Sequence, residues 1–201
     1  MAAGRTTLRR GDPVVRYPTE LECRVTTRDG AQLDLRPIRP DDAPRLVAFH
    51  ELLSPRSIYR RFLFVHPRLS AAEVERFTTV DYLDRLALIV EDDGRLVAVG
   101  RYERIPGTTE AEIAFVVTDE YQHHGIATLL LDRLADAAWG SGVSTFVAYT
   151  LAENRDMVDV FMHSGFAVTT SVEDATTTAR FPIEPDTTYR AARAARSSPT
   201  D

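Results

Sequence analysis

The stretch from residue 112 to residue 131 constrains the fold of this chain more than any other. It opens with the apolar run Ile113–Val117, passes through a polar turn, and continues from Gly125 with apolar residues at three- and four-residue intervals. An apolar run is typical of a buried strand, and that spacing is typical of an amphipathic helix. The stretch therefore predicts a strand that leads through a short loop into a helix.

The loop Gln122-His123-His124-Gly125-Ile126-Ala127 has the properties of an anion site. The first N–H groups of a helix lack partners within the helix, and the helix dipole places about half a positive charge there. Gly125 and Ala127 are small enough to let a diphosphate approach the backbone, and the loop carries no carboxylate of its own. The sequence thus predicts that phosphate binds where this helix begins.

The spacing Gln122-x-x-Gly125-x-Ala127 resembles the Gln/Arg-x-x-Gly-x-Gly/Ala signature of the GNAT superfamily of N-acetyltransferases, whose loop holds the pyrophosphate of acetyl-CoA. The flanks are similar as well, because Glu112 precedes the loop and a strand, a helix and Gly165-Phe166 follow it. The resemblance covers about residues 33 to 183. It implies that acetyl-CoA is the cosubstrate, bound at this loop by Gln122, His123, His124, Gly125, Ile126, Ala127 and Thr128.

The resemblance implies an α/β fold with a mixed, mostly antiparallel sheet, a splayed parallel strand pair and flanking helices. Asp29-Gly30 and Asp93-Gly94 are hairpin signals, and the passage from 111 to 150 reads as a crossover between parallel neighbours. In the family, pantetheine lies in the gap between the parallel strands; by position its strand partners are Phe115, Val116 and Val117.

Periodicity and turn signals place the remaining elements. Helices are expected at 43–53, 71–79, 125–139 and 153–164, and strands at 20–28, 31–36, 86–91, 95–103, 111–117, 144–150, 166–171 and 175–182. Together they form one domain over residues 20–183. The polar ends, residues 1–19 and 184–201, are expected to be disordered.

A second segment bears on the acceptor. The run Ser54-Pro55-Arg56-Ser57-Ile58-Tyr59-Arg60-Arg61-Phe62 looks like the Ser-x-x-Ser-x-Tyr-x-Arg-Phe segment of bacterial protein lysine acetyltransferases. In GNAT folds this region forms one wall of the acceptor site, so the resemblance implies that Tyr59 and Arg60 bind substrate. The alternative is a core-packing turn whose arginines face water.

Acetylation of an amine requires a base, because a lysine with a pKa of about 10.4 is almost fully protonated at pH 7. The resemblance assigns that role to Glu112, with partial burial expected to raise its pKa and a water to relay the proton. The alternative is a strand glutamate that faces solvent, and Glu110 and Glu103 are the other candidate bases.

Two further positions follow from the resemblance. Asn154 matches the asparagine that contacts the pantetheine arm. Phe161 stands where many members carry a tyrosine as general acid, so the leaving thiolate is expected to take its proton from solvent or to need no acid.

Composition excludes several classes of protein. The net charge of -6 argues against a general nucleic-acid binder, and the 24 basic residues are all arginine, which excludes Walker-loop and Schiff-base lysine chemistry. Cys23 stands alone and no apolar run is long enough for a membrane span, so a cytoplasmic protein is expected. The adjacent histidines His123 and His124 should diverge and bind no metal.

These observations predict an enzyme that transfers the acetyl group of acetyl-CoA to a primary amine by direct attack, with the side chain of a protein lysine as the preferred acceptor. An acyl-CoA synthetase is a candidate partner. Two alternatives stay open: a small-molecule amine as acceptor, and a regulatory module that binds acyl-CoA without turnover. The sequence leaves the oligomeric state open.

Overall fold

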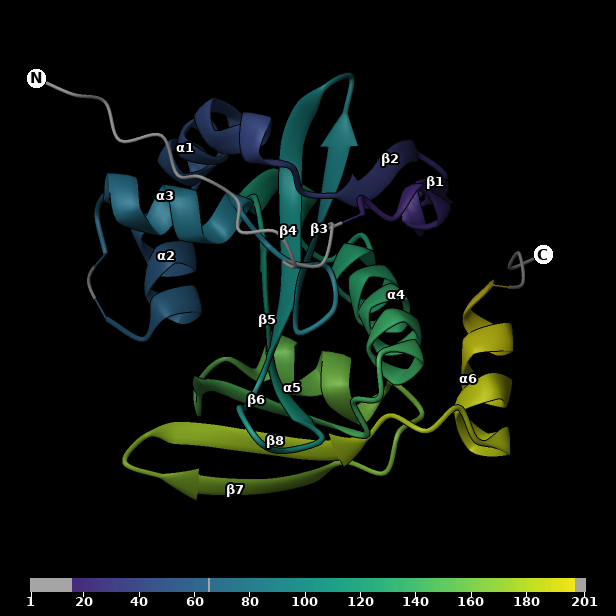
Figure 1. The fold of residues 1–201 in the computed structure, drawn as a ribbon. Helices are drawn as coiled ribbons and strands as arrows, with labels where there is room; N and C mark the ends of the chain where they lie inside the picture. The colour runs from purple at the N-terminus through teal and green to yellow at the C-terminus, as the bar shows by residue number, and fades with distance from the viewer. Residues whose placement is uncertain (1–15, 65, 198–201) are drawn as a thin grey trace, which may run out of the picture.

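The computed structural model describes residues 16–64 and 66–197 (Figure 1). Its centre is a sheet with the strand order β1-β2-β3-β4-β5-β6-β8-β7. Neighbouring strands are antiparallel except β5 and β6, which are parallel. The strands are β1 (Cys23–Thr26), β2 (Gln32–Pro37), β3 (Arg85–Asp92), β4 (Arg95–Arg104), β5 (Glu110–Val117), β6 (Thr145–Leu151), β7 (Thr169–Glu173) and β8 (Thr176–Pro182). The mixed α/β sheet expected from the sequence is confirmed.

The parallel pair separates after a short contact. The paired residues run only from Glu110 with Thr145 to Glu112 with Val147. Beyond that point β5 continues to Val117 and β6 to Leu151 without pairing to each other, and in Figure 1 the lower strands β6, β8 and β7 turn away from β3 to β5. The backbone of β5 past Glu112 therefore has a strand partner on its β4 side only.

Helices cover both faces of the sheet. They are α1 (Ala43–Leu52), α2 (Pro55–Phe62), α3 (Ala71–Thr78), α4 (Ile126–Gly140), α5 (Arg155–Met162) and α6 (Thr187–Ser197). One buried cluster joins α4 and Phe161 of α5 to the sheet, and a second joins α1 to the opposite face. Because both faces are covered, the apolar run of β3 from Leu86 to Val90 is buried without alternation.

Gly100 of β4 allows α4 to lie close to the sheet. A Cβ atom at this position would come within 2.9 Å of Phe115 Cδ1 and 3.2 Å of Leu130 Cβ. The absence of a side chain there fixes how near the helix can come to β5, and with it the position of the loop that enters α4. Among residues 16–64 and 66–197, no helix has the length and apolarity that crossing a bilayer requires.

The two ends differ from the sequence-based expectation. The expected disordered leader lies, for residues 1–15, outside the described residues, whereas Tyr17 packs edge-on against Tyr82 and beneath the Arg39 guanidinium. The expectation of a disordered tail from residue 184 is wrong over Thr187–Ser197, which form α6. The polar, Ala/Arg-rich composition of this segment predicted disorder, but its one aromatic residue, Tyr189, is only 2% exposed and holds the helix in place.

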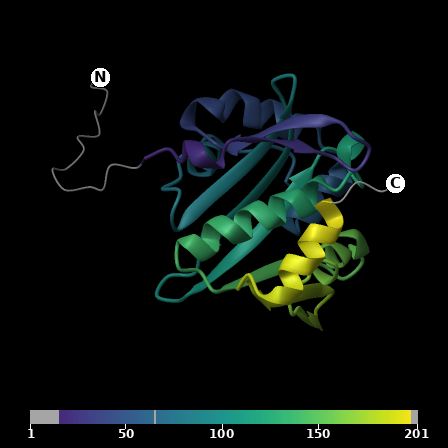
Figure 2. The same cartoon turned by 90° about the vertical axis from the view of Figure 1, so that its right-hand side faces the viewer.

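Helix α6 is held against α4 and the end of α5 (Figure 2). The Tyr189 ring stacks on Phe166 at 4.2 Å between centroids, and its hydroxyl donates to Asp132 at 3.2 Å. Arg196 pairs with Asp132 and donates to the Ser164 carbonyl, while Arg193 pairs with Asp136.

Replacing Tyr189 with alanine should lower the free energy of unfolding by about 3 kcal/mol, because it leaves a cavity beside Phe166 and removes a buried hydrogen bond. Urea unfolding measures the loss. Arg190→Ala, at an exposed position of the same helix, should change the stability by less than about 0.5 kcal/mol. Equal stability of the two variants would contradict the docking of α6.

Candidate active site

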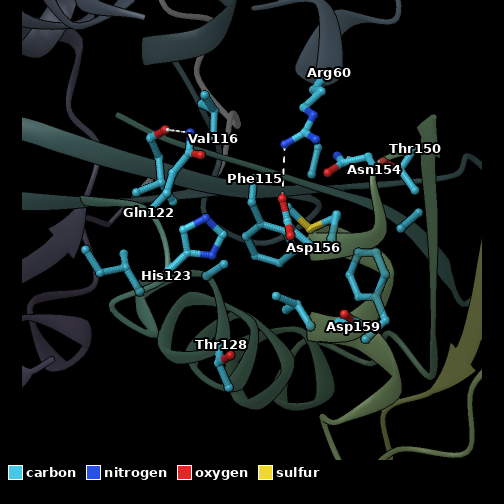
Figure 3. A pocket seen from close by; sticks show the side chains of 18 of the residues that line it. Arg60, Phe115, Val116, Gln122, His123, Thr128, Thr150, Asn154, Asp156 and Asp159 are labelled. Carbon is cyan, nitrogen blue, oxygen red and sulfur yellow. Dashed lines mark hydrogen bonds and ion pairs between the residues drawn. The ribbon is translucent and has the colours of Figure 1, made fainter. Parts of the chain in front are cut away.

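A cleft of about 570 Å³ opens where β5 and β6 separate (Figure 3). Its lining comes from the second half of β5, the loop before α4, the first turn of α4, the end of β6 and one face of α5, with α2 along one side. The sequence-predicted cofactor residues that line it are Phe115, Val116, Val117, Gln122, His123, Gly125, Ile126, Ala127, Thr128 and Asn154.

The loop before α4 has the geometry of an anion site. Gly125 caps the helix with φ +86°, and His123 has φ 68°, so the chain turns sharply twice within three residues. The first bond that the helix makes runs from the Leu129 N–H to the Gly125 carbonyl at 3.1 Å. The N–H groups of residues 126–128 therefore have no acceptor within the helix, and all three residues line the cleft.

The two adjacent histidines diverge, as expected. The His123 side chain is exposed and its ring points into the cleft in Figure 3. His124 does not line the cleft, and its Nδ1 is 2.9 Å from Asp29 Oδ2. His124 was expected to present its main-chain N–H to the cofactor, and its side chain holds the β1–β2 turn.

Gln122, the first residue of the loop signature, fastens the loop to its neighbours. Its side-chain nitrogen donates to the Val117 carbonyl at 3.1 Å and to the Ser57 hydroxyl at 3.1 Å. The side chain thus ties the end of β5 to α2. These two hydrogen bonds explain why a glutamine occupies this position, since one amide nitrogen can donate to two acceptors.

Asp119 joins the cofactor loop to the segment that resembles the protein lysine acetyltransferases. It accepts from the Ser54 N–H at 3.0 Å, the Ser54 hydroxyl at 2.9 Å and the Ser57 hydroxyl at 2.8 Å. These donors outweigh the cost of burial and lower the pKa of Asp119. Ser54 also caps α2 by accepting from the Ser57 N–H. The Ser-x-x-Ser spacing therefore anchors α2 to the loop.

The Ser54–Phe62 segment is a helix, α2, where the sequence predicted only a helix end and a turn. Arg60 lines the cleft and reaches Asp156 of α5 at 3.2 Å, across the mouth shown in Figure 3. Tyr59 is 42% exposed and does not line the cleft. Of the two residues predicted to bind substrate, the structure brings Arg60 alone to the cleft.

Asn154 and Phe161 both line the cleft. Asn154 is 5% exposed, lines the cleft and donates to the Thr150 hydroxyl at 3.0 Å. Phe161 is 1% exposed, with its ring 6.2 Å from that of Phe115. A phenyl ring cannot donate a proton, so the cleft has no acid at this position. Two tyrosines line the cleft elsewhere: Tyr121, and Tyr149 of β6, which is 47% exposed.

Glu112 occupies the last paired position before the strands separate. Its neighbours Ile113 and Phe115 point into the core under α4, so Glu112 lies on the opposite face of the sheet, the face that α2 covers. The side chain is exposed and does not line the cleft, so the expected partial burial is wrong. Its charge acts on Arg61 of α2, whose pKa is lowered by burial and raised in part by Glu112.

The other two candidate bases, Glu110 and Glu103, each form an ion pair with an arginine. Glu110 makes a two-pronged pair with Arg180, which lowers the pKa of Glu110. Glu103 accepts from Arg76 through both carboxylate oxygens. Glu112, by contrast, makes no hydrogen bond or ion pair with the described residues. Of the three carboxylates, it is the one without an arginine partner among the described residues.

Several lining residues escaped the sequence analysis. They are Arg28, Ser57, Arg61, Tyr121, Ala148, Tyr149, Thr150, Asp156, Met157, Asp159, Val160, His163 and Arg196, together with Ile113 and Ala114. About half of them face the cleft from β6 and α5, whose inward positions depend on how the splayed strand is rotated. Arg28 and Arg196 come from the two ends of the domain, and no local pattern places either one near residue 125.

Comparisons with known proteins agree with this geometry. A family model described as "Acetyltransferase (GNAT) domain" matches residues 32–167. The solved GNAT domain of S. lividans PAT is similar at 40% identity, covering 83% of this chain and 99% of that domain with a TM-score of 0.79.

Two curated proteins extend the comparison. Acetyltransferase Pat of Mycolicibacterium smegmatis is 34% identical over 136 residues, which are 66% of this chain and 40% of that protein. An acetyltransferase of Pseudomonas aeruginosa is 30% identical over 152 residues, which are 74% of this chain and 82% of that protein.

Proposed function

Because the chain belongs to the GNAT acetyltransferase family, whose members use acetyl-CoA, we propose that it moves the acetyl group to the side-chain amine of a protein lysine. The single observation that carries the proposal is the cleft at the β5–β6 separation. Free helix N–H groups line it at the start of α4, and the α2 segment lies along one side of it.

The residues of the cleft fit acetyl-CoA. The diphosphate would meet the N–H groups of residues 126–128, next to Gly125 and the small Ala127. The pantetheine arm would lie along β5 at Phe115, Val116 and Val117, where the edge toward β6 is unpaired, with Asn154 beside it. Acetyl-CoA supplies a thioester carbonyl that a neutral amine can attack, with a thiolate as the leaving group.

The remaining steps fall to this chain's own groups. Backbone N–H groups of β5 near Phe115 would polarise the carbonyl oxygen and stabilise the charge that develops on it. Glu112 would remove the proton from the incoming ammonium through a water, since its side chain is exposed on the face that α2 covers. The amine nitrogen would bond to the acyl carbon and lose its second proton to solvent, the carbon–sulfur bond would break, and the thiolate would take a proton from solvent.

A protein lysine is supported by the α2 segment and by charge. The segment from Ser54 to Phe62 is fixed to the cofactor loop through Asp119, so an acceptor held by α2 is positioned relative to the cofactor. A relative covering part of this protein is named acetyltransferase Pat. An acyl-CoA synthetase is a suitable acceptor to try first.

Charge disfavours the first alternative, a polycationic small amine. Arg60 and Arg61 line the cleft, and Arg101 shares a smaller neighbouring pocket with Arg61, where burial lowers the pKa of Arg101 to about 9. Of Asp156 and Asp159, the two carboxylates that line the cleft, Asp156 is paired with Arg60, which leaves one without an ion pair among the described residues. A small amine with several positive charges would need unpaired carboxylates instead.

A thiol-release assay with acetyl-CoA tests the acceptor. We expect turnover with lysine peptides or an acyl-CoA synthetase to exceed that with polyamines, aminoglycosides and free amino acids by at least about tenfold. The chain contains no lysine, so acetylation of its own side chains adds no background. Faster turnover of a small amine would overturn the protein acceptor, and cofactor binding without release of thiol from any acceptor would favour a sensor.

A further inference from the structure

The turn between β1 and β2 is fastened onto the cofactor loop. The Arg28 N–H donates to the His124 carbonyl at 3.0 Å, and the Asp29 carboxylate holds the His124 ring at 2.9 Å. The turn is itself closed by the Gly30 N–H, which donates to the Thr27 carbonyl at 3.0 Å. Arg28 is therefore fixed beside the start of α4, although about a hundred residues separate it from that helix in the chain.

The Arg28 side chain lies over the glycine that caps α4. A Cβ atom on Gly125 would come within 3.1 Å of the Arg28 Cγ and 3.2 Å of its Nε. Arg28 also lines the cleft, on the side of the loop and the helix start. Its guanidinium therefore stands at the same end of the cleft as the free N–H groups of residues 126–128.

This guanidinium makes no hydrogen bond or ion pair with the part of the chain that the structure describes. The neighbouring carboxylate, Asp29, is hydrogen-bonded to the Thr27 hydroxyl and to the His124 ring. The hydrogen bond from Thr27 is the main reason that the pKa of Asp29 is lowered. Arg24, on the same hairpin, pairs with Asp34 at 3.2 Å. Arg28 is exposed, so water solvates its guanidinium, and an anion at this helix end would be attracted both by this side chain and by the helix N–H groups.

We propose that Arg28 is a cofactor-binding residue whose guanidinium contacts a phosphate group of CoA at the start of α4. The proposal rests on the proposed function for the site itself, but it goes beyond it, because Arg28 precedes the residues 32–167 that match the family model. The N-terminal hairpin then supplies a side-chain contact to the cofactor that the loop signature does not contain.

Steady-state kinetics of Arg28→Gln tests the assignment. We expect the KM for acetyl-CoA to rise about tenfold with little change in kcat, because a charge-assisted hydrogen bond far from the thioester contributes to binding alone. The same substitution should leave the KM for S-acetylpantetheine, which lacks every phosphate, unchanged. Acetyl-dephospho-CoA separates the sources of phosphate: a persisting difference from wild type assigns Arg28 to the diphosphate, and a vanished one assigns it to the 3′-phosphate.

Arg24→Gln is the matched control, because it removes an equal charge from the same hairpin at a side chain 73% exposed. Its KM should match wild type, and thermal unfolding of both apo variants should coincide. Equal KM values for Arg28→Gln and Arg24→Gln, in an enzyme that binds CoA, would overturn the role of Arg28 alone. A similar rise with S-acetylpantetheine would also overturn it, by showing that Arg28 only shapes the loop. Absence of CoA binding by wild type would overturn the proposed function and this inference together.

Discussion

Glu112→Gln should lower kcat/KM for the amine by roughly 10²- to 10⁴-fold while the Kd for acetyl-CoA stays near the wild-type value. Glutamine keeps the size of the side chain and removes its ability to accept a proton. The backbone of β5, its pairing with β4 and the N–H groups at the start of α4 are all unchanged. The loss should therefore appear in the chemical step, and calorimetry with CoA should show normal binding.

The exposure of Glu112 shapes this prediction. An exposed carboxylate is a weak base toward an ammonium, so its advantage comes from position and from a relayed water. It also makes no hydrogen bond or ion pair with the described residues, whereas arginines hold Glu110 and Glu103. We expect the activity to increase with pH, since a larger share of the acceptor amine is then neutral on arrival.

Glu110→Gln and Glu103→Gln are the controls, and each should keep at least about a third of the activity because its carboxylate is occupied by arginine. Full activity of Glu112→Gln would remove Glu112 as the base. Wild-type protein that binds CoA but shows no rate with any amine would instead support the sensor alternative.

The fold was predictable because its central signals are local. The strand, loop and helix from Glu112 to Leu131 form as expected, and the Asp29-Gly30 and Asp93-Gly94 turns lie at the tips of the β1–β2 and β3–β4 hairpins. Both turn glycines have positive φ, which explains the residue type. Periodicity and turn chemistry need only neighbouring residues, so one sequence suffices for them.

The features that the sequence analysis did not predict depend on residues far away in the chain. Helix α2 is short and strongly polar, and it is stabilised by Asp119, which lies 65 residues after Ser54. Helix α6 depends on Tyr189 stacking against Phe166 and on Asp132 of α4. Arg28 reaches the cleft through the pairing of β1 with β2 and the hydrogen bond to His124. None of these contacts leaves a pattern in its own stretch of sequence.

The site was predicted better by backbone than by side chain. The loop residues and the β5 triplet all line the cleft except His124, because a spacing of small residues specifies where the main chain is open. The direction of the Glu112 side chain depends on the rotation of β5, and the side chain is exposed rather than partly buried as expected. The direction of the Tyr59 side chain depends on the orientation of α2, and Tyr59 does not line the cleft. Residue spacing thus predicts which main-chain segments line the cleft more readily than the direction of a side chain.

Ala127→Glu should raise the Kd for acetyl-CoA by about 100-fold or more, because a carboxylate placed in the first turn of α4 meets the diphosphate. Ala127 lines the cleft beside the free N–H groups of that turn. The matched variant Ala127→Gln has the same size without the charge, so the ratio of the two Kd values measures repulsion alone. Titration calorimetry with CoA and with S-acetylpantetheine gives both.

The stability of the apo protein should change in the opposite direction. A glutamate in the first turn interacts favourably with the helix dipole and can itself accept from the free N–H groups, so Ala127→Glu should be about 0.3 to 1 kcal/mol more stable than Ala127→Gln in urea. A higher free energy of unfolding together with a higher Kd for CoA in Ala127→Glu would identify the start of α4 as an anion site that the new carboxylate occupies. Equal CoA affinity of the two variants would show that the diphosphate binds elsewhere, and the cofactor orientation proposed for the whole cleft would then be wrong.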